Sequence, residues 1–446
     1  MTERVEMDLH VAAAPAAEPT QYSRAYLIYA VGLLALVNGI NIMDRQIISV
    51  LTPAIKAEMH MSDTEMGFLS GFAFSVFYAI LGIPIAAYAD RSTRRNVVGL
   101  SLIAWTAMTA ISGAAQSFLQ LALARVGVGV GEAGCLPPTH SMVSDYFPAS
   151  LRARVLGIIA SGGTIGGMAA TMLGGYLVFT VGWRETFFLI AIPGVIVGAL
   201  VLLTLREPTR GVQERKVLVS SANDPMTLVD LIRQRPSYLH MVLAVGAGTF
   251  VGYGLGQWLP SFYLRSYGVS MRDIGFAYGG VQALASMTGT VGGGFIGDRL
   301  MRRGGAKLAL IFGITTSLLT FFCALGIVSS QTMAWSLAFN FGSSACGVAF
   351  LGPAFALVQG IAPARLRSQA SAVLTLCVSL IGYGMGPLFV GFLSDTFAAA
   401  GHGDASLRKG MLWGCIFALW PIIHYALARR TIEHDMPASR PAASVG

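Results

Sequence analysis

The sequence predicts an all-α membrane protein in which twelve membrane-spanning helices form two pseudo-symmetric six-helix bundles. The chain of 446 residues is 54% hydrophobic and only 12% charged, whereas an average soluble domain carries about 25% charged residues. Twelve apolar segments are each long enough to cross a bilayer, which takes about 20 residues. Short loop motifs that follow the second and fourth segments recur after the eighth and tenth segments.

The predicted spans follow one another with short polar loops, except for one long polar stretch in the middle of the chain. Their approximate limits are 25–55, 66–89, 96–116, 118–146, 153–180, 185–206, 238–265, 271–298, 305–329, 332–360, 366–397 and 405–429. The first segment is too long to be the core of a cleavable signal peptide. The order predicts five parts, which are an N-terminal tail (1–24), a six-helix bundle (25–206), a linker (207–237), a second six-helix bundle (238–429) and a C-terminal tail (430–446).

The basic residues predict the orientation of the chain in the membrane. Twenty-two of the 30 lysines and arginines fall on the side that holds both tails and the linker, and six fall on the other side. Cytoplasmic loops carry such an excess of positive charge. We therefore expect both termini in the cytoplasm, with the protein in a bacterial inner (plasma) membrane. Because the basic residues cluster in short loops between apolar segments, the net charge of +8 does not indicate nucleic-acid binding.

The two halves of the chain repeat each other. Residues 89–95 (ADRSTRR) recur as 297–303 (GDRLMRR), and residues 148–152 (PASLR) recur as 363–367 (PARLR). Parallel repeats of this kind are related by an axis along the membrane normal, and they hold substrate near the midplane between them. We therefore expect a binding site between the two bundles.

Four charged residues lie at membrane depth, all in the first six spans. Asp44 and Arg45 are in the first span, and Arg125 and Glu132 are in the fourth. Each costs about 2.5–3.5 kcal/mol by insertion scales, so such residues mark functional sites. Adjacent helix residues point about 100° apart, so Asp44 and Arg45 are expected to have separate partners on other helices, although a structural ion pair between them is the alternative. Residues seven apart share a helix face, which places Arg125 on the same face as Glu132, about two turns away.

These charges suggest proton-coupled binding of an anion. Burial disfavours the charged form of a carboxyl group, so Asp44 and Glu132 are expected to carry the coupled protons. Arg45 and Arg125 are expected to hold the substrate's charged group. The alternatives are a Glu132 that stays neutral within the bundle and an Arg125 that only supports helix packing. Six further side chains are expected to line the substrate site: Asn41, Gln257, Trp258, Gln282, Asn340 and Tyr383.

One glycine motif has a competing interpretation. Residues 129–134 match the dinucleotide fingerprint G-x-G-x-x-G, but no strand precedes them and they lie in a membrane span. We expect these glycines to contact the first span closely instead. The sequence has no G-x-x-x-x-G-K-[ST], no H-E-x-x-H and no C-x-x-C. We therefore expect no cofactor, no bound metal and no enzymatic activity, in a protein that acts as a monomer.

The loop motifs resemble those of the major facilitator superfamily along nearly the whole chain. The family pattern G-x-x-x-D-R-x-x-R-R matches fully at 294–303, and its first copy has Ala86 in place of the glycine. The pattern R-x-x-x-G-x-G matches in the fourth span. The resemblance implies a conformational latch in which Asp90 caps a helix start in the opposite half and Arg94 or Arg95 pairs with Asp145. The latch residues are Asp90, Arg91, Arg94, Arg95 and Asp145, with Asp298, Arg299 and Arg302 as their counterparts.

Two shorter motifs narrow the resemblance to one branch. N-x-x-D-R at 41–45 and G-x-G-E at 129–132 are similar to the spinster-like branch, whose eukaryotic members are associated with sphingosine phosphate and lysophospholipid transport. A D-R pair in the first span also occurs in sugar-acid and other organic-anion symporters of the superfamily. The resemblance therefore implies a proton-coupled transporter of a small anionic or amphipathic, even lipid-like, solute. The alternatives are a sugar-acid or other organic-anion symporter and an uncoupled facilitator.

Overall fold

The computed structural model describes residues 22–210 and 226–436, and within these ranges the chain is helical with no strand. The N-terminal half contains α1 (Arg24–Met59), α2 (Asp63–Gly67), the π-helical η1 (Phe68–Phe72), α3 (Ala73–Ala89), α4 (Arg94–Ala114), α5 (Phe118–Glu132), α6 (Leu136–Tyr146), α7 (Ala149–Thr180) and α8 (Trp183–Thr204).

The C-terminal half repeats this arrangement of long helices with short interruptions. It contains α9 (Leu228–Gln234), α10 (Pro236–Tyr267), α11 (Met271–Ser329), α12 (Met333–Ala349), α13 (Leu351–Ile361), the 3₁₀ segment η2 (Ala364–Leu366), α14 (Arg367–Cys377), the π-helical η3 (Val378–Met385), α15 (Gly386–Ala399), α16 (Ala405–Cys415), the 3₁₀ segment η4 (Ile416–Leu419) and α17 (Trp420–Asp435).

The fold contains the twelve spans that the hydropathy predicts. Eleven continuous helical stretches within the described ranges are long and apolar enough to cross a membrane. One of them, α11, has 59 residues, which at 1.5 Å per residue is far too long for a single crossing. Its backbone leaves the helical region at Gly304 and Gly305, where Gly305 has φ 64°. A glycine adopts this left-handed conformation readily, so the chain turns there and α11 forms two spans of an integral, multi-pass membrane protein.

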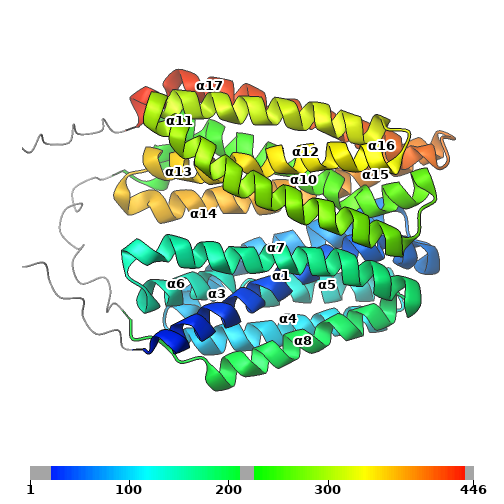
Figure 1. The fold of residues 1–446 in the computed structure, drawn as a ribbon, viewed down its shortest axis with the longest axis horizontal. Coiled ribbons are helices and arrows are strands. Elements are labelled where there is room, and N and C mark those ends of the chain that lie inside the picture. Colours follow the sequence, from blue (N-terminus) through cyan, green and yellow to red (C-terminus); the bar gives the residue numbers. More distant parts are fainter. Residues whose placement is uncertain (1–21, 211–225, 437–446) are drawn as a thin grey trace, which may run out of the picture.

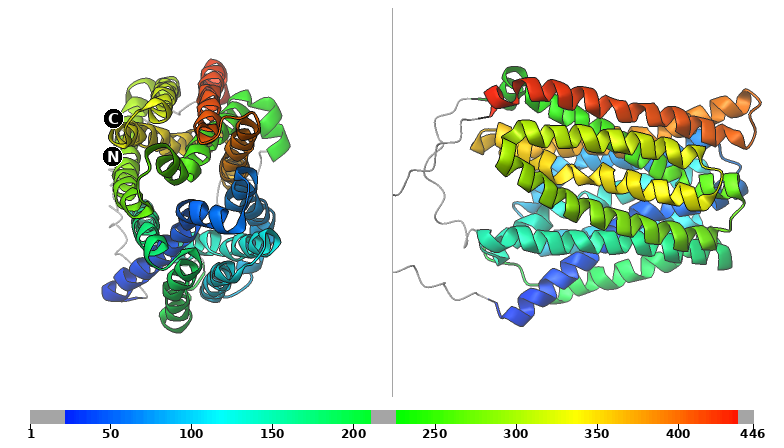
Figure 2. Two further views of the ribbon diagram at one scale, coloured as in Figure 1. Left: turned by 90° about the vertical axis from the view of Figure 1, so that its right-hand side faces the viewer. Right: turned by 45° about the horizontal axis from the view of Figure 1, so that its top comes forward.

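The two halves lie side by side with their helices roughly parallel. In Figure 1, α1 and α3–α8 occupy the lower part of the molecule and α10–α17 the upper part. The start of α1 and the end of α17 lie at the same, left-hand end, which we call the termini end; the opposite end is the far end. The end-on view in Figure 2 shows the halves as two groups of helices. They approach closely where α7 meets α11, since a Cβ at Gly175 would lie 2.6 Å from the Met271 carbonyl oxygen.

The glycine-rich face of α5 packs against α3 and α4, and not against the first span as the sequence suggested. A Cβ at Gly129 would lie 2.6 Å from the Phe74 carbonyl oxygen, and one at Gly131 would lie 2.7 Å from Trp105 Cβ. Small residues let membrane helices approach in this way. The expected contact with the first span is wrong because α1 is instead packed closely against α7, where Gly39 lies beside Gly162.

Candidate functional site

A cavity of about 530 Å³ lies between the two halves. Its walls come from α1, η1, α3, α5 and α7 on one side and from α10, α11, α12, α13, η3 and α15 on the other. Arg45 and Arg125 are the charged side chains among the described residues that line it. The volume is in the range of pockets that enclose small organic molecules. The wall from the N-terminal half is therefore cationic. The wall from the C-terminal half, which we call the neutral wall, contains no charged side chain among the described lining residues.

Arg45 forms an ion pair with Glu132 that joins α1 to α5. The Arg45 Nε donates a hydrogen bond of 2.7 Å to Glu132 Oε2. The Glu132 side chain is fully buried and that of Arg45 is 10% exposed. Arg45 faces the cavity, whereas Glu132 lies behind it and does not line the cavity wall. The two neighbouring charges of α1 thus point in different directions, as the helix geometry predicts.

Three aromatic rings surround the guanidinium of Arg45. Its Cζ lies 4.8 Å from the ring centroid of Phe74, 4.7 Å from that of Tyr78 and 5.6 Å from that of Tyr383. A guanidinium is attracted to the face of such rings. Phe74 and Tyr78 come from α3, whereas Tyr383 comes from η3 in the other half. Phe74 and Tyr78 were not predicted from the sequence, although their spacing of four residues places them on one helix face.

Asp44 and Arg125 are buried without completed hydrogen bonds. Neither carboxylate oxygen of Asp44 and neither Nε nor Nη1 of Arg125 has a hydrogen-bond partner among the described residues. The Asp44 carboxyl group lies beside Trp105 and Thr109 of α4. Buried polar groups in folded proteins are nearly always paired, so each exception calls for a reason. One such reason would be that these charged groups change partners during the transport cycle.

Five of the six neutral residues expected at the site lie at or next to the cavity. Gln257, Gln282, Asn340 and Tyr383 line it. Asn41 is buried beside Glu132, behind the wall. The expectation for Trp258 is wrong in this structure. Its side chain is fully buried and its indole Nε1 donates a 2.9 Å hydrogen bond to the Pro387 carbonyl oxygen, so the ring holds α10 against α15.

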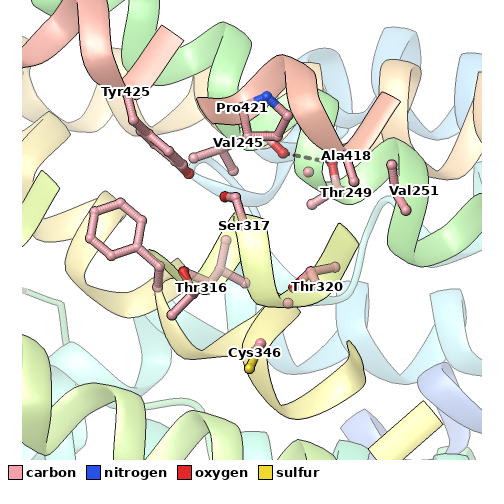
Figure 3. Close-up of a pocket in the computed structure, with 14 residues that line it drawn as sticks. Val245, Thr249, Val251, Thr316, Ser317, Thr320, Cys346, Ala418, Pro421 and Tyr425 are labelled. Atoms are coloured by element: carbon pink, nitrogen blue, oxygen red, sulfur yellow. Dashed lines mark hydrogen bonds between the residues drawn. The ribbon is translucent and has the colours of Figure 1, made fainter. Parts of the chain in front are cut away.

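A smaller chamber of about 40 Å³ lies in the C-terminal half and shares part of its lining with the cavity. Figure 3 shows Thr249 and Thr320, which line both spaces, together with Ser317 and Thr316. Most of these hydroxyls are bound to backbone carbonyls, such as Thr249 Oγ1 to Val245 at 3.0 Å. The Thr320 hydroxyl has no partner among the described residues. The chamber therefore adds a free polar group to the neutral wall.

At the termini end, part of the expected latch is assembled within one half. Arg94 is buried, and its Nη1 lies 2.5 Å from Asp145 Oδ2 while its Nε lies 2.8 Å from Glu207 Oε1. From the sequence, Glu207 was expected only to begin the linker. The backbone N–H of Arg95 also donates to Glu207, at 2.9 Å. The remaining expected latch residues are exposed and make no hydrogen bond or ion pair to the opposite half within the described ranges: Asp90, Arg91, Asp298, Arg299 and Arg302.

At the far end, an ionic cluster that the sequence analysis missed joins the two halves. Asp63 accepts two hydrogen bonds of 2.7 Å from the guanidinium of Arg265 and one of 2.5 Å from Lys56. Asp395 of α15 accepts from the backbone N–H groups of Asp63 at 3.0 Å and Thr64 at 2.7 Å. The Asp395 carboxylate thus caps the start of α2 in the other half. Such loop-end residues give no signal in a single sequence, because only the fold brings them together.

Comparison with known proteins agrees with this architecture. A sequence model of the Major Facilitator Superfamily matches residues 34–387. The chain is 33% identical to an MFS-type efflux pump of Mycolicibacterium smegmatis, over 91% of this chain and 94% of the relative. It is 26% identical to a probable L-galactonate transporter of Escherichia coli, over 90% of this chain and 89% of the relative. A solved bacterial homolog of the human lysosomal transporter spinster, inward-facing and unoccupied, has a TM-score of 0.83 and 29% identity, covering 94% of this chain and 100% of that chain.

Proposed function

Because the chain belongs to the major facilitator superfamily, and resembles its spinster-like branch, we propose that it is a proton-coupled secondary transporter of a small anionic or amphipathic organic solute. The protein works by alternating access between two six-helix bundles (25–206 and 238–429). It sits in a bacterial inner membrane with both termini and the linker in the cytoplasm, where the excess of basic residues belongs.

The observation that carries the proposal is the Arg45–Glu132 ion pair at the back of the cavity. Two carboxyl groups, Asp44 and Glu132, are buried together with two arginines, Arg45 and Arg125, and the formal charges of the four groups sum to zero. Protonation of Glu132 removes one negative charge and releases Arg45. The site then carries one uncompensated positive charge, which an anionic substrate neutralises. Proton binding and anion binding favour one another in this scheme, as linkage between two sites requires.

The contacts between the halves support an inward-open state. Hydrogen bonds and ion pairs between described residues of opposite halves occur in two places. One is beside the cavity, where Gln257 donates to Thr52. The other is the far end, around Asp63. With the termini in the cytoplasm, the far end is the outer gate and it is closed. The similarity to an inward-facing solved structure agrees with this assignment.

Proteoliposomes loaded at one pH and diluted into another test the coupling. Asp44→Asn and Glu132→Gln are expected to abolish substrate accumulation driven by a pH gradient, because neither amide can take up or release the proton. Glu58→Gln is the matched control, since Glu58 is an exposed α1 carboxylate that pairs with Arg184 within the same half; it should accumulate substrate as the wild type does. Undiminished accumulation by both Asp44→Asn and Glu132→Gln would exclude proton coupling through these residues.

A sugar-acid symporter is the second candidate, and one observation favours it. The 26% identical relative is described as a probable L-galactonate transporter, and a sugar acid would use the same arginines for its carboxylate.

An uncoupled facilitator would give a different result in the proteoliposome experiment. In that case both variants would still equilibrate substrate across the membrane, and even the wild type would never concentrate it.

A further inference from the structure

The neutral wall of the cavity contains a cluster of side-chain amides and hydroxyls. Gln282 comes from the first span of α11, and Asn340 and Ser344 come from successive turns of α12. All three line the cavity. They lie in the C-terminal half, whereas both cavity arginines lie in the N-terminal half. A bound molecule that touches an arginine on one side therefore meets amides on the other.

The hydrogen bonds within this cluster leave donors free. Gln282 Oε1 accepts from Ser344 Oγ at 2.9 Å and from Asn340 Nδ2 at 3.4 Å. The acceptor of Gln282 is thus occupied, while its amide nitrogen, with two N–H groups, makes no hydrogen bond to any described residue. The Asn340 nitrogen uses one of its two N–H groups inside the cluster. The amide nitrogen of Gln282, a residue of the cavity wall, is consequently free to donate to a bound molecule.

The hydroxyl of Thr320 is a further polar group beside the cavity. Thr320, in the second span of α11, is 9% exposed, and its buried hydroxyl has no partner among the described residues. Thr320 lines both the main cavity and the side chamber. A buried hydroxyl without a partner loses its hydrogen bonds to water and gains nothing in return. It is positioned to receive a polar group of a bound molecule.

We infer that Gln282, Asn340, Ser344 and Thr320 form a subsite for uncharged oxygen atoms of the substrate, so that the transported molecule is a hydroxylated organic acid. This inference rests on the proposed function, because it takes the anionic group to be held at Arg45. An alkyl chain at the same wall would leave the free N–H groups desolvated and unpaired. A site built to bind a substrate hydroxyl strongly rejects the analogue that lacks it.

The test compares acids of equal carbon number with and without hydroxyl groups. Purified full-length protein in detergent is titrated calorimetrically with gluconate, galactonate, hexanoate and a lysophospholipid at one pH and one salt concentration. At least one of the two hydroxylated acids is expected to bind at least about 10-fold more tightly than hexanoate and the lysophospholipid. Gln282→Leu and Asn340→Leu are expected to remove that preference while leaving hexanoate binding unchanged, which also shows that the variants are folded.

Gln359→Leu is the matched control, because Gln359 lies in the same half, is exposed and bonds to Ser371 outside the cavity. It should bind all four probes as the wild type does. The inference is overturned if neither hydroxylated acid binds more tightly than hexanoate and the lysophospholipid, or if Gln282→Leu and Asn340→Leu leave the preference intact. These titrations contain no gradient, so loss of coupling in proteoliposomes and loss of the hydroxyl preference are separate results.

Discussion

The side chain of Arg45 has two kinds of partner, a carboxylate and a set of aromatic rings. Its Nε is bound to Glu132, and its Nη2 has no hydrogen-bond partner among the described residues. A guanidinium keeps its charge at any physiological pH and presents its donors as a planar fork. The fork can donate to one oxygen at its unused edge, and it can donate in a bidentate way to a carboxylate or phosphate once the bond to Glu132 is broken.

Arg45→Lys tests this role at the scale of one residue. A lysine keeps the charge but loses the fork and the stacking on Phe74 and Tyr78. Charged hydrogen bonds contribute about 1.5–3 kcal/mol each, so substrate binding is expected to weaken about 10- to 100-fold without loss of the fold. Isothermal titration with an identified substrate gives the affinity, and a melting curve checks the fold.

The same titration at two pH values provides the control. Wild-type protein is expected to bind substrate more tightly at mildly acidic pH, because protonation of Glu132 releases Arg45. In Glu132→Gln the residue at 132 is already uncharged, so the affinity should be high and independent of pH. Equal affinity of the wild type and Arg45→Lys would remove Arg45 from the site and favour Arg125 as the anion-binding residue.

At the scale of single elements, the start of α2 is the part of the N-terminal half that is tied most directly to the opposite half. Its first backbone N–H groups donate to Asp395. The side chain of its first residue, Asp63, accepts two hydrogen bonds from Arg265. Asp63 is 2% exposed, whereas its partners Arg265 and Lys56 are 20% and 29% exposed. The helix start thus acts as the closing contact of the far end.

Asp63→Asn is expected to open the far end. The amide keeps the volume of the carboxyl group but leaves Arg265 and Lys56 without their anion. Breaking a buried pair costs about 3–5 kcal/mol, and the partial exposure of both cations reduces this to about 1–3 kcal/mol against the inward-open state. Spin labels at Gln116 and His402, in far-end loops of the two halves, should show a larger share of long distances by double electron–electron resonance.

Glu58→Gln again provides the comparison for this element. Glu58 lies near the same end of the molecule but pairs with Arg184 in its own half, so its loss should leave the label distances unchanged. Unchanged distances in Asp63→Asn as well would show that this cluster does not hold the gate.

At the scale of the whole molecule, the two ends should respond in opposite directions. Asp90 is exposed and has no cross-half bond among the described residues, as expected if its helix-capping contact forms only when the termini end closes. Asp90→Ala should therefore remove a contact of the outward-open state and raise the inward-open population. Spin labels on loops 90–93 and 303–306 should report longer distances, the opposite redistribution to that from Asp63→Asn. At these same termini-end labels Asp63→Asn should shorten the distances, because opening of the far end closes the termini end. Distances that change in the same direction in both variants at this one label pair would contradict alternating access through these two gates.

The sequence by itself determined the number of spans, the internal repeat and the presence of charges at membrane depth. It could do so because the bilayer imposes strong local rules. Every backbone polar group in lipid must be satisfied within a helix, so each span appears as a long apolar segment, and charges such as those of Asp44 and Arg45 stand out against it. The different directions in which these two side chains point also followed from the geometry of one helix.

The groups that meet in the site became known from the folded arrangement of the helices. This arrangement paired Arg45 with Glu132 and left the Asp44 carboxylate without a hydrogen-bond partner among the described residues. It also enclosed the guanidinium in rings from both halves, turned Trp258 away from the cavity and built the Asp63 cluster at the far end. These outcomes depend on how each helix is rotated about its axis and on which helices are neighbours. Packing between helices sets both, and packing arises from contacts between residues that are far apart in the chain.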